Sequence, residues 1–235
     1  GNVGFEELIE MHVDEEHNLV ILGSTNSTYF FFHGMDTVMN NSDHNPFLAK
    51  YSSDGDLLLG IMNQHQVFET ATDLYIDRDN NYFIRSFYNG DKYQGEDTTM
   101  VSLPYNTNRY PSRGFIRKYN KLGEFQWAWQ LEGAFEVGPL YGIVALNNDI
   151  VISGAFREGE LYLGQDTFYN STSGDIENGF LLFLNKDDGS FKQYIMTQGQ
   201  YHRRFFDLHA DYDNNLDLFM RYSGKDTIFD TPFES

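Results

Sequence analysis

Short apolar runs separated by turn residues make up most of the chain. Within the first 66 residues the pattern predicts strands at LIEMHV, NLVILGS, TYFFFHG, PFLAKYS and DLLLGIMN. The links between runs, such as SSDGD, NKLGE and NKDDGS, supply Asp, Asn and Gly where a tight turn needs a positive φ. No window has a sustained helical period with caps. The pattern therefore predicts an all-β protein built from antiparallel strands.

One short phrase recurs along the chain. It reads DEEHNLVI from Asp14, DRDNNYFI from Asp77 and DYDNNLDL from Asp211, and a copy that has lost the Asp occurs within 141–154. A second phrase follows it as FLAKY, FIRKY and FLLFL, beginning at Phe47, Phe115 and Phe180. Because the order of the two phrases never changes, we interpret them as tandem repeats. The repeat units are approximately residues 4–66, 67–133, 134–200 and 201–235, the last one incomplete.

Repeats of this length, each a small antiparallel sheet, usually pack radially as β-propeller blades. The first phrase is then the tight turn between the first two strands of every blade. Closed propellers need about four to eight blades. Three and a half units therefore predict either a segment of a larger ring or an open stack, and a parent chain that continues in both directions.

Composition narrows the class of partner. A net charge of −19 repels phosphate backbones and anionic lipid surfaces, so nucleic-acid binding is not expected. No apolar run approaches the roughly 18 residues of a membrane span, so membrane insertion is not expected either. The absence of Cys excludes disulfides and thiolate metal sites. These features are compatible with an exported protein.

The two phrases together resemble the repeats of secreted bacterial β-propeller proteins (SBBP-like) of Bacteroidetes type. Matching residues include Asp14 through Gly23, Asp77 through Asn81, Phe115 through Tyr119, Gly123 and Trp127. Ser86 stands where the pattern has a strand-ending Gly, and only the second unit has the Trp. The resemblance implies an extracellular or outer-surface location and a scaffold type of protein, without a particular reaction.

The repeated turn is a candidate metal site. Asp77, Asp79 and Asn81 place oxygens at i, i+2 and i+4, as in the first part of a calcium loop, and Asp211, Asp213 and Asn215 do the same. Tyr82 occupies the position where such loops need Gly, and no Glu closes the loop. The alternative is a hairpin turn in which these side chains accept backbone hydrogen bonds. No other cofactor is expected. A second metal hypothesis pairs His12 with His209, which share one register.

Two further features are candidate binding surfaces. Phe125, Trp127 and Trp129 alternate along one predicted strand, so they are expected on one face, either stacking on sugar rings or filling the space between blades. The longest interstrand loop contains Arg109, Tyr110 and Arg113, an Arg–Tyr cluster that could contact a partner or be a solvated insertion.

Three Asp-Thr pairs are candidate sites of O-glycosylation. Thr37, Thr98 and Thr227 each follow an Asp, and these sites resemble the acceptor of Bacteroidetes-type O-glycosylation, although Asp-Thr is also an ordinary turn pair.

The sequence carries no G-x-S-x-G, H-E-x-x-H or phosphate-binding Gly loop. Carboxylate pairs are too frequent among 35 acidic residues for spacing to select a general acid and base. We therefore expect a non-catalytic binding or structural segment. Its partners would be other parts of its parent chain and a surface or export-complex protein or glycan. The alternatives are a glycan-active propeller enzyme and a passenger fragment bound to an export complex.

Overall fold

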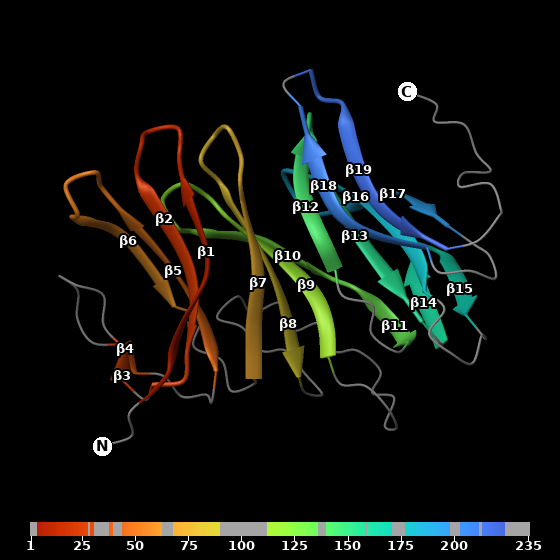
Figure 1. Ribbon diagram of the computed structural model, residues 1–235, viewed down its shortest axis with the longest axis horizontal. Helices are drawn as coiled ribbons and strands as arrows, with labels where there is room; N and C mark the ends of the chain where they lie inside the picture. The colour runs from red at the N-terminus through yellow and green to blue at the C-terminus, as the bar shows by residue number, and fades with distance from the viewer. Residues whose placement is uncertain are drawn as a thin grey trace. The chain divides into compact units, whose positions relative to one another are not determined.

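The computed structural model describes residues 4–27, 29–30, 38–39, 44–62, 68–89, 112–135, 140–157, 159–170, 177–197, 203–211 and 213–223. These residues form strands and turns and contain no helix, so the predicted all-β class is confirmed. The chain divides into two compact units, Gly1–Gln130 and Leu131–Ser235, and each has its own sheets (Figure 1).

Unit 1 contains two four-stranded antiparallel sheets, and in each sheet every strand pairs with the strand of that sheet that follows it along the chain. Sheet 1 consists of β1 (Glu6–Val13), β2 (Leu19–Thr25), β5 (Asn45–Tyr51) and β6 (Leu57–Met62). Sheet 2 consists of β7 (Phe68–Ile76), β8 (Tyr82–Asn89), β9 (Ser112–Tyr119) and β10 (Phe125–Gln130). Between β2 and β5, the short strands β3 (Tyr29–Phe30) and β4 (Val38–Met39) pair with each other. Four of the five strands predicted in the first repeat match sheet 1, whereas only Tyr29–Phe30 of TYFFFHG is a described strand.

Unit 2 begins with the same arrangement. It contains a six-stranded sheet, in which β12 (Leu140–Leu146), β13 (Asp149–Phe156), β16 (Asn178–Asn185) and β17 (Phe191–Met196) pair antiparallel in this order, and we call these four strands sheet 3. The hairpin of β18 (Arg203–Ala210) and β19 (Leu216–Tyr222) joins sheet 3 through one parallel pairing of Asn178 with Arg203. A separate three-stranded sheet contains β11 (Glu132–Phe135), β14 (Gly159–Leu163) and β15 (Asp166–Asn170).

The repeated phrase forms the turn between the first two strands of sheets 1, 2 and 3 and the turn of the β18–β19 hairpin. His17, Asn80, Asn147 and Asn214 have φ of 63°, 62°, 54° and 62° in the four turns. This left-handed conformation favours Asn among residues other than Gly, which explains the amide-rich sequence. The turn predicted from the phrase is therefore confirmed at all four positions.

The strand before each of these four turns, β1, β7, β12 or β18, also contains a β-bulge at an equivalent place. The register shifts between Leu8 and Glu10, Ala71 and Asp73, Leu140 and Gly142, and Phe205 and Asp207. A bulge leaves an extra residue unpaired in the ladder and re-aims the side chains beside it. The residues directly after the bulges are Glu10, Asp73, Gly142 and Asp207.

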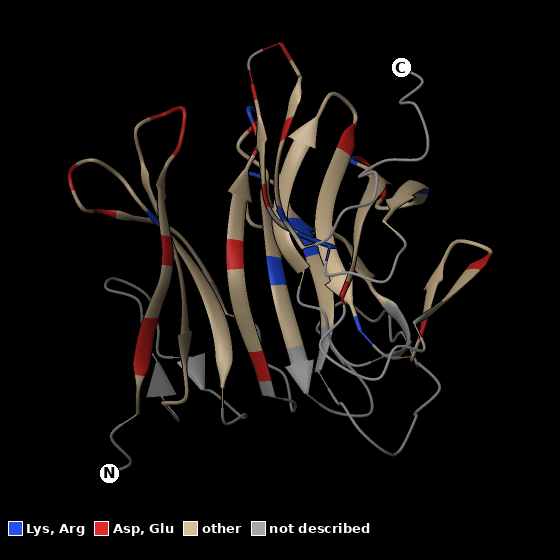
Figure 2. Ribbon diagram, turned by 45° about the vertical axis from the view of Figure 1, so that its right-hand side comes forward, with Lys and Arg blue, Asp and Glu red and all other residues tan. Residues whose placement is uncertain are grey.

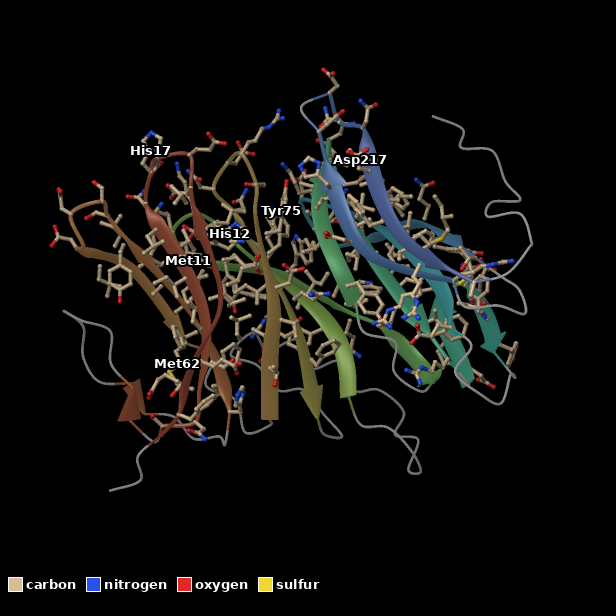
Figure 3. The ribbon with its side chains drawn as sticks, in the orientation of Figure 1. Met11, His12, His17, Met62, Tyr75 and Asp217 are labelled. Carbon is tan, nitrogen blue, oxygen red and sulfur yellow. The ribbon has the colours of Figure 1, made fainter. Side chains whose placement is uncertain are left out.

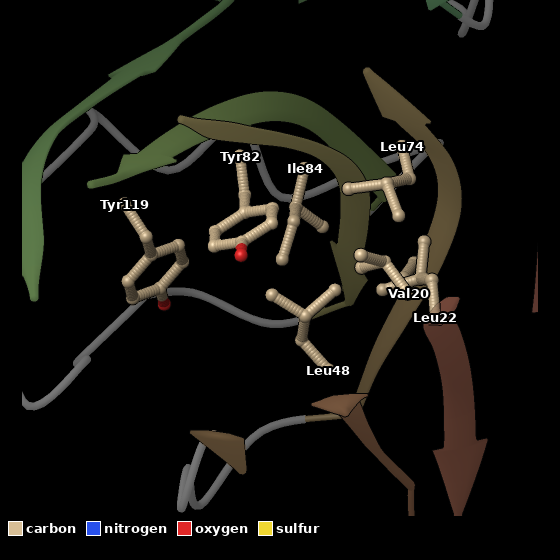
Figure 4. Close-up of a cluster of buried hydrophobic side chains, with 8 residues drawn as sticks. Val20, Leu22, Leu48, Leu74, Tyr82, Ile84 and Tyr119 are labelled. Carbon is tan, nitrogen blue, oxygen red and sulfur yellow. The ribbon is translucent and has the colours of Figure 1, made fainter. Parts of the chain in front are cut away.

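Sheets 1 and 2 pack face to face through an apolar cluster (Figure 4). The cluster contains Val20, Leu22 and Leu48 from sheet 1 and Ala71, Leu74, Tyr82, Ile84 and Tyr119 from sheet 2. These side chains are at most 5 % exposed, and burying one large aliphatic side chain stabilises the fold by about 1.5–3 kcal/mol. The cluster fixes the first strands, β1 and β7, next to each other.

Candidate functional site

The Asp-rich turns use their carboxylates internally. Asp77 Oδ1 accepts hydrogen bonds from the backbone N–H groups of Asp79 (3.0 Å) and Asn81 (2.8 Å), and the side-chain amide of Asn81 donates to both Asp77 oxygens. Asp211 accepts from Asp213 and Asn215 in the same way, each at 2.8 Å. These are the contacts of a hairpin turn. Within the described residues no group of three His, Asp or Glu side chains is placed to hold a metal, and calcium binding at the turns stays a prediction.

In sheet 1 the turn Asp also pairs with the Lys of the second phrase. Lys50 Nζ lies 2.6 Å from Asp14 Oδ2, and both side chains are buried. Burial opposes ionisation of Asp14, but hydrogen bonds from Lys50 and Asn18 outweigh it and lower the pKa of Asp14. By strand register Lys118 occupies the Lys50 position in sheet 2, and Phe183 occupies it in sheet 3, whose turn has no Asp. Sheet 3 thus lacks both the Asp and the Lys that form this ion pair in sheet 1.

The aromatic residues of β10 do not form a single row. A bulge between Phe125 and Trp127 pairs Phe125 with Tyr119 and Trp127 with Lys118, and neighbouring residues of β9 point to opposite faces. Phe125 therefore packs against the cluster between sheets 1 and 2, so the prediction that it shares a face with Trp127 is wrong. Trp127 is 6 % exposed with its ring 5.9 Å from that of Phe83, whereas Trp129 is partly exposed.

Several predicted sites lie outside the described residues. They are Arg109, Tyr110, Thr37, Thr98 and Thr227. Arg113 belongs to β9, where it pairs with Tyr88, but its side chain is not described. Binding by the loop and glycosylation of the Thr residues stay predictions.

A carboxylate pair that the sequence did not single out lies between the first strands of sheets 1 and 2. Glu10 follows the bulge of β1, and Asp73 follows the bulge of β7. The Leu74 backbone N–H donates to Glu10 Oε2 at 2.6 Å, so a side chain of sheet 1 caps the backbone of sheet 2. The two carboxyl groups also lie close enough to influence each other's pKa.

A His and an Arg flank this pair from its two ends. His12 Nε2 lies 2.8 Å from Glu10 Oε1, on the side of β1 that faces β7, while Met11 lies on the other side (Figure 3). Arg85 Nη2 lies 3.2 Å from Asp73 Oδ2, and the Arg85 side chain is buried. The predicted partnership of His12 with His209 stays a prediction, because His209 belongs to unit 2, where it lies 3.8 Å from Asp217.

The two carboxyl groups have pKa values that move in opposite directions. Burial raises the pKa of Asp73 to about 7, and the negative charge of Glu10 adds to this increase against the opposing effect of Arg85. Burial also opposes ionisation of Glu10, but hydrogen bonds from His12 and the Leu74 N–H lower its pKa. The hydrogen bond to Glu10 raises the pKa of His12. Near neutral pH the cluster therefore holds an ionised Glu10 beside an Asp73 that gains and loses a proton.

A positional signal for this pair was present in the sequence. Glu10, Asp73 and Asp207 each lie four residues before an anchor Asp of the repeated phrase, at Asp14, Asp77 and Asp211. The spacing alone could not show that two of these side chains meet, since the meeting depends on the bulges and on the packing of one sheet against the next.

A second buried charge pair lies within sheet 2. Arg117 and Glu69 are at most 1 % exposed and form an ion pair, and the Arg117 guanidinium lies 4.9 Å from the ring centre of Phe115. Removal of either partner would leave an uncompensated buried charge. We assign this pair a role in the stability of sheet 2.

No protein-family model matches the chain, and no curated protein matches it in sequence. Among the described residues there is also no helix with the length and apolar character needed to cross a membrane.

Proposed function

We propose that this chain is a non-catalytic binding and structural segment of a β-propeller, in which each four-stranded sheet is one blade. The observation that carries the proposal is the recurrence of one design. Sheets 1, 2 and 3 have the same strand order, the same left-handed turn and the same first-strand bulge, and sheets 1 and 2 pack face to face. Stacking of such sheets is how propeller blades cover each other's faces.

The proposed setting is the outside of a bacterial cell, as a secreted or cell-surface protein. Acidic residues occupy the tips of several hairpins (Figure 2), and the net charge of −19 favours solubility. Loops on a rigid β scaffold are where recognition of a protein or glycan is expected. The other partner is the remainder of the parent propeller.

The carboxylate pair makes a glycan-cleaving enzyme the second candidate function. It has the split pKa values that acid–base catalysis uses. Its geometry favours a structural role, because both oxygens of Glu10 are engaged within the protein, by the Leu74 N–H at 2.6 Å and by His12 Nε2 at 2.8 Å.

An assay of binding and cleavage on one panel separates the two functions. The protein is incubated with soluble xylan, mannan, glucan and chitin oligosaccharides, and reducing-end release is measured beside retention on the immobilised glycans. We expect retention on at least one glycan without release, and the same retention for Asp73→Asn. Release of reducing ends that Asp73→Asn abolishes would establish the enzyme instead.

A further inference from the structure

Sheet 1 has a second apolar face, opposite the face that packs against sheet 2. Neighbouring residues of a strand point to opposite faces, so Met11 points away from β7 while His12 points towards it (Figure 3). Leu8, Met11 and Val13 are 60 %, 56 % and 66 % exposed. We call the face that carries these three residues the outer face of sheet 1.

The outer face of sheet 1 is equivalent to the face of sheet 2 that sheet 1 covers. Strand register defines the equivalence, because Met11 pairs with Ile21 as Leu74 pairs with Ile84. Six residues on the covered face of sheet 2 are Ala71, Leu74, Ile76, Tyr82, Ile84 and Tyr119. The residues at the same positions of sheet 1 are, in the same order, Leu8, Met11, Val13, Leu19, Ile21 and Tyr51. All six are apolar or aromatic, which is typical of an interaction surface.

In sheet 3 the same positions are apolar and buried. Ile143, Ile150 and Ile152 have the register of Met11, Leu19 and Ile21, and they are at most 5 % exposed. At these positions, sheet 1 therefore differs from sheet 3 in the exposure of the side chains and not in their apolar character.

The covered face of sheet 2 shows which partner fits the outer face of sheet 1. Sheet 1 covers it with aliphatic side chains such as Val20 and Leu22, and with Glu10, which accepts from the Leu74 N–H. A fitting partner is thus a sheet of the same repeat, with an acidic residue after the bulge of its first strand. A second copy of this chain cannot supply this face from its own sheet 1, because sheet 2 already covers it.

We propose that the outer face of sheet 1 binds a further four-stranded sheet of this repeat, contributed by the parent chain. The acidic first-strand residue of that sheet accepts a hydrogen bond from the Met11 N–H, as Glu10 does from the Leu74 N–H. The proposal rests on the proposed function, since it names the surface through which the segment joins the remainder of the propeller.

The test uses thiol labelling, because the chain has no Cys and one introduced thiol reports on one position. Met11→Cys is prepared in the chain and in an extended protein, in which a second copy of residues 5–67 is inserted before Phe5. This insertion keeps the natural spacing between β6 and the first strand of the next sheet. N-ethylmaleimide should label the thiol at least about tenfold more slowly in the extended protein, because the thiol reacts only when the two sheets separate.

Leu58→Cys is the matched control. Leu58 is 54 % exposed, but Gln126, which has its register in sheet 2, stays exposed although sheet 1 covers that sheet. Labelling of Leu58→Cys should therefore be equally fast in both proteins. Glu10→Ala in the added copy alone should speed up the labelling of Met11→Cys again, by about threefold, because the Met11 N–H loses its acceptor.

Equal labelling rates of Met11→Cys in the two proteins would overturn the proposal, and so would an equal slowing of Leu58→Cys. An added sheet that stays unfolded, seen as no gain of β signal in far-UV circular dichroism, would overturn it too. Slow labelling in the chain without the insertion that becomes faster on dilution would make a second copy the occupant instead. The labelling reports only on this face, whereas the glycan panel reports on recognition and cleavage, so either result can fail without the other.

Discussion

At two junctions between neighbouring groups of strands, the backbone N–H of a Leu is hydrogen-bonded to a carboxylate, but the carboxylate comes from a different strand in each case. One is the junction of sheets 1 and 2 in unit 1, and the other is the junction of sheet 3 with the β18–β19 hairpin in unit 2. In each, a Leu is the second residue after a bulge. It is Leu74 in β7 at the first junction and Leu208 in β18 at the second. The backbone N–H of that Leu donates to a carboxylate at both junctions.

The source of the carboxylate differs. Leu74 donates to Glu10 of the preceding sheet at 2.6 Å, whereas Leu208 donates to its own neighbour, Asp207, at 2.9 Å. Gly142 occupies the position of Glu10 in sheet 3, and a Cβ added there would lie 2.9 Å from the Leu208 nitrogen. Gly142 thus allows a close approach of the two backbones that a side chain would prevent. The comparison indicates that the acidic residue of the first strand serves as a cap, which another residue can replace.

The largest effect on stability is expected when a Glu is introduced at the second junction, where Gly142 occupies the position of Glu10. Gly142→Glu puts a Cβ against the Leu208 backbone and a carboxylate where there is no room for it. We expect a loss of about 3 kcal/mol of unfolding free energy from overpacking and an unpaired charge. Urea denaturation followed by far-UV circular dichroism measures it. Unchanged stability would mean that the two junctions are interchangeable, which contradicts the comparison.

Removing the cap at the first junction should have a smaller effect. Glu10→Ala leaves the Leu74 N–H without its acceptor, which costs about 2 kcal/mol. Glu7→Ala is the matched control, since Glu7 is an exposed Glu of the same strand and its replacement should change stability by less than about 0.5 kcal/mol. Equal urea midpoints for the two variants would show that Glu10 does not hold the sheets together.

The first junction is also expected to respond to pH, because Asp73 takes up a proton on folding. Its pKa is about 7 in the folded protein and about 3.9 in an unfolded chain, so between these values the folded state binds more protons. The contribution of Asp73 to stability is therefore greatest below about pH 4 and decreases as the pH rises to about 7. Glu10, with its lowered pKa, acts in the opposite sense at acidic pH.

Asp73→Asn removes this dependence. Relative to the variant, the wild-type protein should lose on the order of 2 kcal/mol of unfolding free energy between pH 5 and pH 8. Urea midpoints at the two pH values give the difference. The charge of Asp73 also raises the pKa of His12, so the His12 titration is followed by NMR in both proteins and its contribution is subtracted. Parallel pH profiles would show that Asp73 is not the titrating group.

Local elements of this fold could be predicted from the sequence because their causes are local. The amide-rich turns follow from the positive φ of His17, Asn80, Asn147 and Asn214, and the strands follow from the alternation of apolar residues. The all-β class and the first-two-strand turns were predicted on these grounds and are confirmed.

Contacts between sheets could not be predicted, because bulges change which face a side chain occupies. One inserted residue moved Phe125 to the opposite face from Trp127, and another placed Glu10 beside Leu74. The burial of Asn80 could not be predicted for a related reason. The four turns look alike in sequence, and only the packing of neighbouring turns distinguishes the buried Asn80 from the exposed Asn214.

The smallest expected effect concerns His12. Its pKa depends on the Glu10 carboxylate that accepts from the Leu74 N–H, whereas its own contribution to stability is small. Its hydrogen bond to Glu10 outweighs partial burial and raises its pKa above 6.5, so it should titrate later than an ordinary His in an NMR pH series. In Glu10→Gln the partner loses its charge, and the His12 pKa should return towards its usual value. The Leu74 N–H keeps an acceptor in this variant, so the two sheets should stay together. An unchanged His12 pKa in Glu10→Gln would place the responsible carboxylate elsewhere and remove Glu10 from the centre of the first junction.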